Sequence, residues 1–284
     1  MNIDSYWEYS DPAASEARFR GALPQATADE RLELLTQIAR THSLRRQFGA
    51  AHALLDEVEP QLGSAGPAPR TRYLLERGRT FNSAGDKARA AGLFRQAWKT
   101  ASAAHLDGLA VDAAHMLAIV EPPASAAAWT ERGVDLARAS TDAKARGLLP
   151  ALLNNHAWNL HGDARYDEAL LAFREAEVAW HASGRQPQGR IATWSVARCL
   201  RSLQRYEEAL QLQQRLEQEW QADGSADGYV FEEIAENLEA LGRREEATAY
   251  FRRAEGELGK DPQFARDNPA RLARITAMGR RSSF

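Results

Sequence analysis

Hydrophobic residues recur at intervals of three and four along most of the chain, with polar residues between them. This spacing is typical of amphipathic helices, and the alternating runs of Val, Ile and Thr that indicate strands do not occur. Pro150 lies inside one helical segment, where it would remove a backbone hydrogen bond, so we expect that helix to begin or to kink near it. The pattern predicts an all-α protein whose helices are joined by short polar turns.

The helical segments repeat in one frame, in which a polar turn leads into an apolar helix that carries a small anchoring residue. The anchors of the six copies are Ala51, Ala90, Ala126, Ala169, Ala209 and Ala247, and the copy at Ala126 is the weakest. Successive anchors lie 36 to 43 residues apart, about 39 on average. A period of this length with two helices per unit predicts a solenoid, in which each unit buries its apolar face against its neighbours.

These repeats resemble the tetratricopeptide repeat family. The second copy carries the family's small and aromatic positions as Gly78, Phe81, Gly85, Ala90, Phe94 and Ala97, and the fourth and sixth copies carry similar sets. The resemblance implies a right-handed α-solenoid of six helix-turn-helix units, with a period longer than the family's usual one of about 34 residues. We therefore expect an aromatic arm and a short capping helix over residues 1–26, six repeats over 27–259, and a capping helix with a basic tail over 260–284.

Both ends carry residues that the repeats do not explain. Tyr6, Trp7 and Tyr9 precede the first helix, and exposed aromatic rings need a surface to pack on. We expect them to cover the first repeat; a sharper hypothesis places this arm in the protein's own groove or in that of a second protomer. At the other end, we interpret the arginines as a solvated polar cap rather than as a site for an anionic partner; they are Arg271, Arg274, Arg280 and Arg281.

The first helix of each unit lines the concave surface in the family, so the resemblance also implies which side chains face a partner. The partner-binding positions in this frame are Arg40, Arg79, Asn82, His115, Asn154, Asn155, Trp158, His161, Trp194, Arg198, Arg201, Glu232 and Glu236. Arginine pairs with carboxylates, asparagine bonds the main chain of a peptide, and tryptophan is a large amphipathic anchor. This set predicts a groove with arginines in its amino-terminal and central parts and acidic residues at its last copy. The family's carboxylate clamp for chaperone tails needs asparagine at the position of Arg40, so the clamp is not matched.

Each of these side chains also has a structural interpretation. Trp158 and Trp194 can serve as packing residues, and the asparagines can join neighbouring helices. The glutamates of the last copy, which include Glu233 and Glu239, are interpreted as a solvated helix face.

Composition and charge remove several classes of function. The 36 basic and 39 acidic residues leave a formal net charge of −3, which gives no cationic field for nucleic acid. Charged residues interrupt every apolar run before the roughly 20 residues that a membrane helix requires, and residues 1–7 do not resemble a secretory signal. Cys199 is the single cysteine, so the chain cannot form an internal disulfide, and its apolar surroundings favour a small buried side chain. We expect a cytoplasmic protein with no membrane partner.

No catalytic or metal-binding motif occurs in the sequence. His156 and His161 lie five residues apart, which does not bring both onto one helical face as metal ligands. We predict no metal and no cofactor.

The sequence therefore predicts a non-enzymatic adaptor that binds an extended or helical peptide in its concave groove. A peptide with acidic or carboxylate groups is one candidate. The alternative is a regulatory protein in which a peptide changes the curvature of the solenoid and thereby switches a second partner. An enzyme with an unrecognised site near Trp158, His161 and Arg198 is the least favoured class. A monomer and a dimer both remain open.

Overall fold

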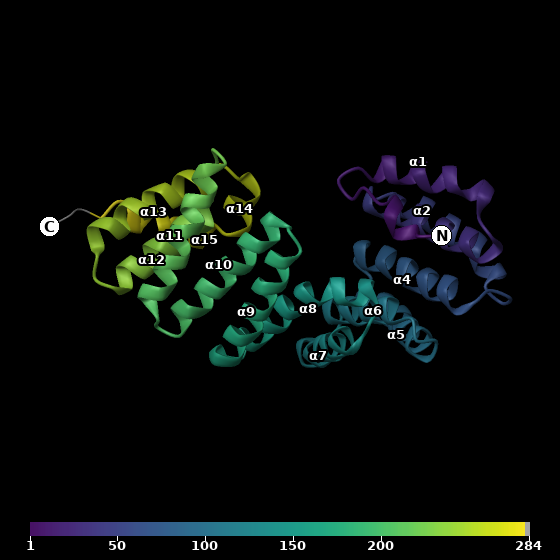
Figure 1. Ribbon diagram of the computed structural model, residues 1–284. Helices are drawn as coiled ribbons and strands as arrows, with labels where there is room; N and C mark the ends of the chain where they lie inside the picture. The colour runs from purple at the N-terminus through teal and green to yellow at the C-terminus, as the bar shows by residue number, and fades with distance from the viewer. Residues whose placement is uncertain (282–284) are drawn as a thin grey trace. The chain divides into compact units, whose positions relative to one another are not determined.

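The computed structural model describes residues 1–281, except for the side chains of residues 123 and 124. This part of the chain folds into fifteen α-helices and three short 3-10 helices, with no strand among the described residues (Figure 1). The predicted all-α class is confirmed.

Twelve of the helices follow one another as six pairs, which correspond to the six predicted repeats. The pairs are α2 (Ala28–Leu44) with α3 (Phe48–Val58), α4 (Pro67–Ser83) with α5 (Lys87–Ala103), α6 (Asp107–Val120) with α7 (Pro123–Ala139), α8 (Ala143–Gly162) with α9 (Tyr166–Ala182), α10 (Gln186–Ser202) with α11 (Tyr206–Ala222), and α12 (Gly228–Ala240) with α13 (Arg244–Leu258). The remaining helices are η1 (Ile3–Tyr6), α1 (Pro12–Ala22) and η2 (Leu23–Gln25) before the first pair, η3 (Glu59–Gln61) after α3, and α14 (Pro262–Asp267) and α15 (Pro269–Gly279) after the last pair.

The turn inside five of these pairs has the same geometry. In each, a residue with positive φ ends the first helix, and the next residue donates its N–H to the carbonyl five residues earlier at 2.9 Å. The residues with positive φ are Arg46, Gly85, Ala164, Gln204 and Gly242. Each lies five residues before the anchoring alanine of its copy, so the turn fixes the register of the two helices. The α6–α7 pair, which contains the weakest copy, has no such residue between its helices.

The small residues of the repeat frame lie where the helices approach each other most closely. The six anchoring alanines are buried, and Phe94, Phe173 and Phe251 in the second helices are 0% exposed. A Cβ atom on Gly78 of α4 would lie 2.5 Å from the Phe94 ring of α5, so only glycine fits there. Cys199 is also buried, as predicted.

The helices gather into two compact units, and each is described by itself. Unit 1 comprises residues Met1–Leu152, and unit 2 runs from Leu153 to the end of the described chain. The division falls inside α8, after Pro150. The helix start expected at this proline is wrong, because α8 begins at Ala143 and continues through it. Its beginning is set instead by Asp142, whose carboxylate accepts a hydrogen bond from the Lys144 N–H at 2.7 Å.

Polar side chains cap the helices at both ends of the chain. Asp11 accepts hydrogen bonds from the N–H groups of Ala13 and Ala14, and Thr27 and Glu30 form a capping box. Asp261 caps α14 in the same way. The assignment of residues 260–284 to a cap with a basic tail stays a prediction, and residues 282–284 of that tail lie outside the described residues.

Candidate functional site

The predicted groove positions lie on the first helices of the pairs. We call the surface that these side chains form the first-helix face; α2, α4 and α6 supply it in unit 1, and α8, α10 and α12 supply it in unit 2. The two faces differ in chemistry.

A row of aromatic side chains runs along the first-helix face of unit 2. It consists of Trp158, Trp194, Tyr229 and Phe264, one from each of α8, α10, α12 and α14. Neighbouring ring centroids are 6.2 Å, 6.5 Å and 5.7 Å apart. We call these four side chains the aromatic row.

The two indoles of the row are half-buried, so each combines packing with an accessible edge. Trp158 packs edge-on against Phe173 of α9, with the ring centroids 4.9 Å apart. The Trp194 indole N–H donates to the Tyr229 carbonyl at 3.4 Å. These contacts hold the rings in place, which lowers the conformational entropy that binding would cost.

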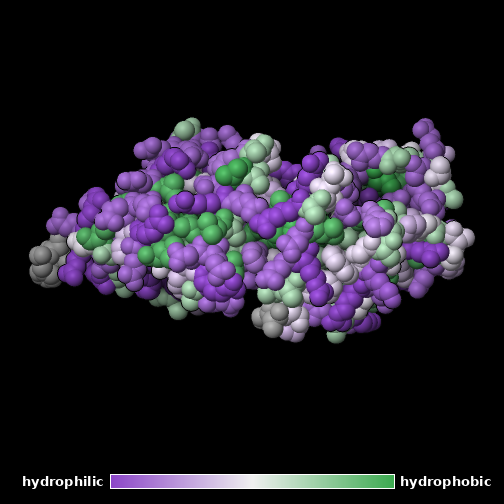
Figure 2. Space-filling model, turned by 60° about the horizontal axis from the view of Figure 1, so that its bottom comes forward, coloured by the Kyte–Doolittle hydropathy of each residue, from purple (hydrophilic) through white to green (hydrophobic). Residues whose placement is uncertain are grey.

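A cavity of about 240 Å³ opens beside the row. It is lined by Arg190, Ile191, Trp194, Trp220, Asp227, Tyr229 and Val230. Ile191 and Tyr229 are 59% and 41% exposed, which is unusual for large apolar side chains. Figure 2 shows hydrophobic surface between hydrophilic side chains over unit 2, at the left of the view.

Two charged side chains border this cavity. Arg190 lies over the Trp220 ring, 4.5 Å from its centroid, and pairs with Asp223 at 2.6 Å. Burial raises the pKa of Asp227, although its carboxylate accepts hydrogen bonds from the Tyr229 and Val230 N–H groups. The cavity is therefore apolar with a polar rim, as in many peptide-binding surfaces.

A basic pair lies on α10 next to the row. Arg201 holds both oxygens of Glu233, at 2.7 and 3.0 Å, whereas the Arg198 Nε is 3.3 Å from the same carboxylate. Burial and the neighbouring Arg201 lower the pKa of Arg198 despite the opposing effect of Glu233. The Glu233 carboxylate thus pairs with two guanidinium groups and balances only one of their two positive charges. A further anion near Arg198 would therefore be stabilised.

His161 joins this basic pair to the aromatic row. Its Nε2 lies 2.9 Å from the Ser202 hydroxyl, which also accepts a hydrogen bond from Arg198 at 2.7 Å. The His161 ring is 5.2 Å from that of Trp158. Burial, followed by the positive charges of Arg198 and Arg201, lowers the pKa of His161, so the ring is neutral at pH 7.

The acidic end of the predicted groove is neutralised inside unit 2. Glu232 and Glu233 are 3% and 2% exposed, so the interpretation of these glutamates as a solvated face is wrong. Arg271 of α15 contacts both oxygens of Glu232, and Arg274 pairs with Glu236. The reason is the return of α15 onto the preceding pair, which brings the predicted solvated arginines to these glutamates. Arg281 pairs with Glu239 and Arg280 lies 3.9 Å from Glu255.

The predicted asparagines have no chemical role assigned by the structure. Asn154 and Asn155 are half-buried on α8, one turn before Trp158. Asn82 is half-buried near the end of α4 in unit 1, where its main-chain carbonyl accepts a hydrogen bond from Gly85.

The predicted basic residues of unit 1 form an internal ion-pair network. Glu76, 2% exposed, accepts hydrogen bonds from Arg79 at 2.7 Å and from Arg40 at 3.4 Å. Arg79 also pairs with Asp112, and although burial opposes ionisation, Arg79 lowers the pKa of Asp112 to about 2. Burial lowers the pKa of His115 on the same helix.

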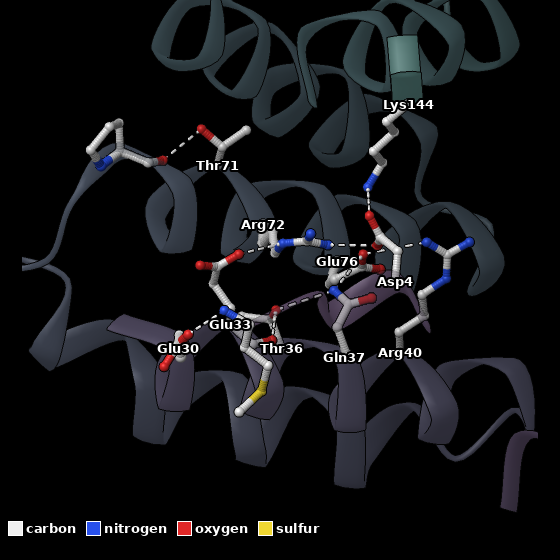
Figure 3. A network of polar contacts seen from close by, with 12 residues as sticks. Asp4, Glu30, Glu33, Thr36, Gln37, Arg40, Thr71, Arg72, Glu76 and Lys144 are labelled. Carbon is white, nitrogen blue, oxygen red and sulfur yellow. Dashed lines mark hydrogen bonds and ion pairs between the residues drawn. The ribbon is translucent and has the colours of Figure 1, made fainter. Parts of the chain in front are cut away.

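The amino-terminal arm, residues 1–10, lies on this network (Figure 3). Asp4 contacts Arg72 of α4 at 3.3 Å and Lys144 of α8 at 2.9 Å. The Trp7 indole N–H donates to Gln37 at 3.0 Å. Tyr6 and Trp7 cover the first repeat as expected, since both pack on the cluster that contains Leu34 and Ile38 of α2. Tyr9 does not, because it is 62% exposed.

Sequence reasoning missed several residues of both faces. Tyr229 precedes Glu232 by three residues in the same frame that gave Trp194, and Phe264 follows the recognised helix start at Asp261, so a search for aromatics along the frame would have found them. Asp4 carried no such signal, because its partners are 68 and 140 residues away.

Two further searches concern only the described part of the chain. Among residues 1–281, no three His, Cys, Asp or Glu side chains gather in a way that could hold a metal ion. None of the helices described is both long and apolar enough to cross a membrane.

Comparison with known proteins identifies the fold. No protein-family model matches the chain, and no curated protein resembles its sequence significantly. The apo form of RapI is 13% identical, with a TM-score of 0.72 over 92% of this chain and 76% of RapI. NprR in complex with its cognate peptide NprX is 14% identical, with a TM-score of 0.52 over 96% of this chain and 81% of NprR.

A tetratricopeptide repeat protein from Parabacteroides merdae is similar over nearly the full length of both chains. It is 14% identical, with a TM-score of 0.52 over 97% of this chain and 96% of the other. Together with the six helix pairs, these similarities show that the chain has the fold of the tetratricopeptide-repeat-like helical repeat proteins.

Proposed function

We propose that the protein is a non-enzymatic adaptor that binds a peptide segment of a partner protein on the first-helix face of unit 2. The observation that carries this proposal is the aromatic row with its adjoining cavity. Three consecutive first helices and the following α14 each contribute one ring, and the cavity leaves room for a side chain beside Trp194 and Tyr229.

The chemistry of this face specifies the kind of peptide. An aliphatic or aromatic side chain placed in the cavity would leave water, which stabilises a complex by about 1.5–3 kcal/mol. A carboxylate next to it would pair with Arg198. The Arg198 Nε lies 3.3 Å from the Glu233 carboxylate, whereas the Arg201 Nε lies 2.7 Å from it, so Arg198 is the less fully paired of the two. We therefore propose a ligand with a large apolar residue close to an acidic residue or to a carboxyl terminus.

A solved structure with this fold supports a peptide as the ligand. NprR, which shares this fold, is known in complex with its cognate peptide. By analogy, this chain would hold an extended segment against several first helices at once.

A displayed library of random peptides tests the proposal. Peptides selected on the wild-type protein should be enriched in the predicted apolar and acidic residues. Titration calorimetry should then show a loss of affinity of at least about thirtyfold in the Trp194→Ala/Arg198→Ala variant, because an anchoring side chain accounts for about 2 kcal/mol or more.

A matched control uses the same residue types outside this face. Trp180 lies on α9 and Arg205 in the turn before α11, where it pairs with Glu208. The Trp180→Ala/Arg205→Ala variant should keep wild-type affinity. The proposal would be contradicted if both double variants lost affinity for the peptides equally. It would also be contradicted if the selected peptides bound both double variants with wild-type affinity.

A peptide-gated regulator is the second candidate, and the similarity to NprR, a quorum sensor from B. thuringiensis, favours it. Such a protein changes shape when the peptide binds, whereas a simple adaptor does not. Small-angle scattering with and without a selected peptide separates them: a change in the radius of gyration supports the regulator, and superimposable curves support the adaptor.

A further inference from the structure

The amino-terminal arm occupies groove positions of unit 1. Asp4 contacts Arg72 of α4 and Lys144 at the beginning of α8 (Figure 3). Trp7 contacts Gln37 of α2. Arg40 of α2 is one of the groove positions that the resemblance implies. The arm therefore contacts unit 1 as a bound peptide would, through side chains that reach three first helices.

The arm is held mainly by side chains. Its only regular structure is the four-residue helix η1, and it contributes no strand or long helix to unit 1. Trp7 stacks on Tyr9 with centroids 4.8 Å apart, and the Arg40 guanidinium lies 5.3 Å and 5.6 Å from the centroids of the two rings. Tyr9 is 62% exposed, so the arm ends in solvent.

The polar surface around the arm is incompletely satisfied. Three buried atoms have no hydrogen-bond partner among the described residues: the Arg40 Nε, the Glu76 Oε2 and the His115 Nδ1. An unmet buried polar group costs about 1–3 kcal/mol, and this cost falls when ordered water or a ligand supplies the missing hydrogen bond.

We propose that the first-helix face of unit 1 is a second peptide-binding surface and that the arm is its displaceable internal occupant. The ligand is an extended segment with an acidic side chain followed three residues later by an aromatic one, as Asp4 is followed by Trp7. The acidic group pairs with Arg72 and Lys144, and the aromatic group lies on Arg40 and bonds Gln37. Partner binding at this face requires release of the arm.

This second surface is independent of the proposed role of unit 2. Its residues all lie within residues 1–152, whereas the site proposed for unit 2 lies after them. Either site can therefore fail a test while the other passes.

A peptide added in trans tests the proposal in the full chain. The probe is residues 2–10, acetylated, amidated and labelled with fluorescein, and binding is followed by fluorescence anisotropy. Wild-type protein should bind it weakly, because the attached arm competes. The Asp4→Asn variant, which weakens the arm's ion pairs without altering its apolar packing, should bind the probe at least about tenfold more tightly.

Further variants locate the site. Adding Arg72→Ala to Asp4→Asn should remove the gain in affinity. A probe in which Asp4 is replaced by Asn should bind the Asp4→Asn variant no more tightly than it binds the wild-type protein. Asp135→Asn, an exposed acidic change on α7, is the matched control and should leave the wild-type affinity unchanged. Trp194→Ala/Arg198→Ala combined with Asp4→Asn should keep the gain.

Three results would overturn the proposal: equal weak binding by wild type and by a folded Asp4→Asn variant, tight binding that survives Arg72→Ala, or tight binding that is lost with Trp194→Ala/Arg198→Ala. Far-UV circular dichroism establishes that each variant is folded. If Asp4→Asn does not fold, hydrogen exchange of wild-type residues 2–10 is measured at saturating unlabelled probe. Faster exchange then supports displacement of the arm, and unchanged exchange contradicts it.

Discussion

Cys199 shows how burial alone determines the reactivity of a side chain. The thiol is 0% exposed and donates to the Tyr166 carbonyl at 3.3 Å. Burial raises its pKa to about 11, which outweighs the opposite effect of the neighbouring Arg198. The thiolate that reacts with electrophiles is therefore scarce at neutral pH.

We predict that Ellman's reagent modifies Cys199 at least about 100-fold more slowly in the native protein than in urea at pH 8. The chain has a single cysteine, so the absorbance change reports this residue alone. A fast native reaction would mean that α10 opens readily around the thiol.

At the same scale, sequence reasoning identified residue types better than residue partners. Arg198 and Trp158 were singled out by the frame, and the structure does bring them to one region with His161. The buried state of Glu232 was not predictable in this way, because it depends on Arg271, 39 residues later and outside the repeats. The repeat frame predicts which side chains lie on the first helices, but their charge partners can lie on helices outside the repeats, such as α15.

Within single helix pairs, packing depends on small residues at a few crossings. Gly78 in α4 faces the Phe94 ring, and an added methyl group would force the two helices apart. Gly92 in α5 has open space around it. The same substitution should therefore have opposite effects in the two helices of one pair.

We predict that Gly78→Ala lowers the free energy of unfolding by about 1–3 kcal/mol through overpacking. Gly92→Ala should raise it by about 0.5–1 kcal/mol, since alanine loses less backbone entropy in a helix. Urea denaturation of the two variants beside wild type measures both values. Stabilisation by Gly78→Ala would show that α4 and α5 are packed more loosely than described.

The helices themselves were largely predictable, since each repeat encodes its pair locally. Periodicity and anchoring alanines recur in every copy, and the turn residues recur in five of the six, so the stronger copies fix the frame for the weakest one. The predicted helix start at Pro150 was wrong because Asp142 begins α8 more than one turn earlier, and the helix continues through the proline. The arm's partners lie too far away in sequence for any local pattern to reveal them.

For the whole molecule, the two compact units predict that stability is not uniform along the chain. Helical repeats are stabilised by interactions with their neighbours, so a local defect spreads over a limited distance. Unit 1 and unit 2 each contain their own clusters of buried side chains, such as the one around Phe94 and the one around Phe251.

We expect Gly78→Ala to lower hydrogen-exchange protection in α4 and α5 while the peptides of α12 and α13 keep wild-type protection. Mass spectrometry of the exchanged protein resolves these regions. A uniform loss of protection along the chain would show that the protein unfolds as one cooperative unit.

The constant spacing inside the helix pairs has a consequence for how such a chain can change over time. Five residues separate the left-handed turn residue from the anchoring alanine in five copies, while the copies themselves recur at 36 to 43 residues. The copies therefore differ in length outside the stretch from the turn residue to the alanine. Duplication, loss or exchange of genetic segments that end between the pairs would move an intact hairpin together with the side chain it presents, such as Trp194. The heritable module of the proposed binding surface is the hairpin, and new specificities can arise by reshuffling hairpins as well as by changing single residues.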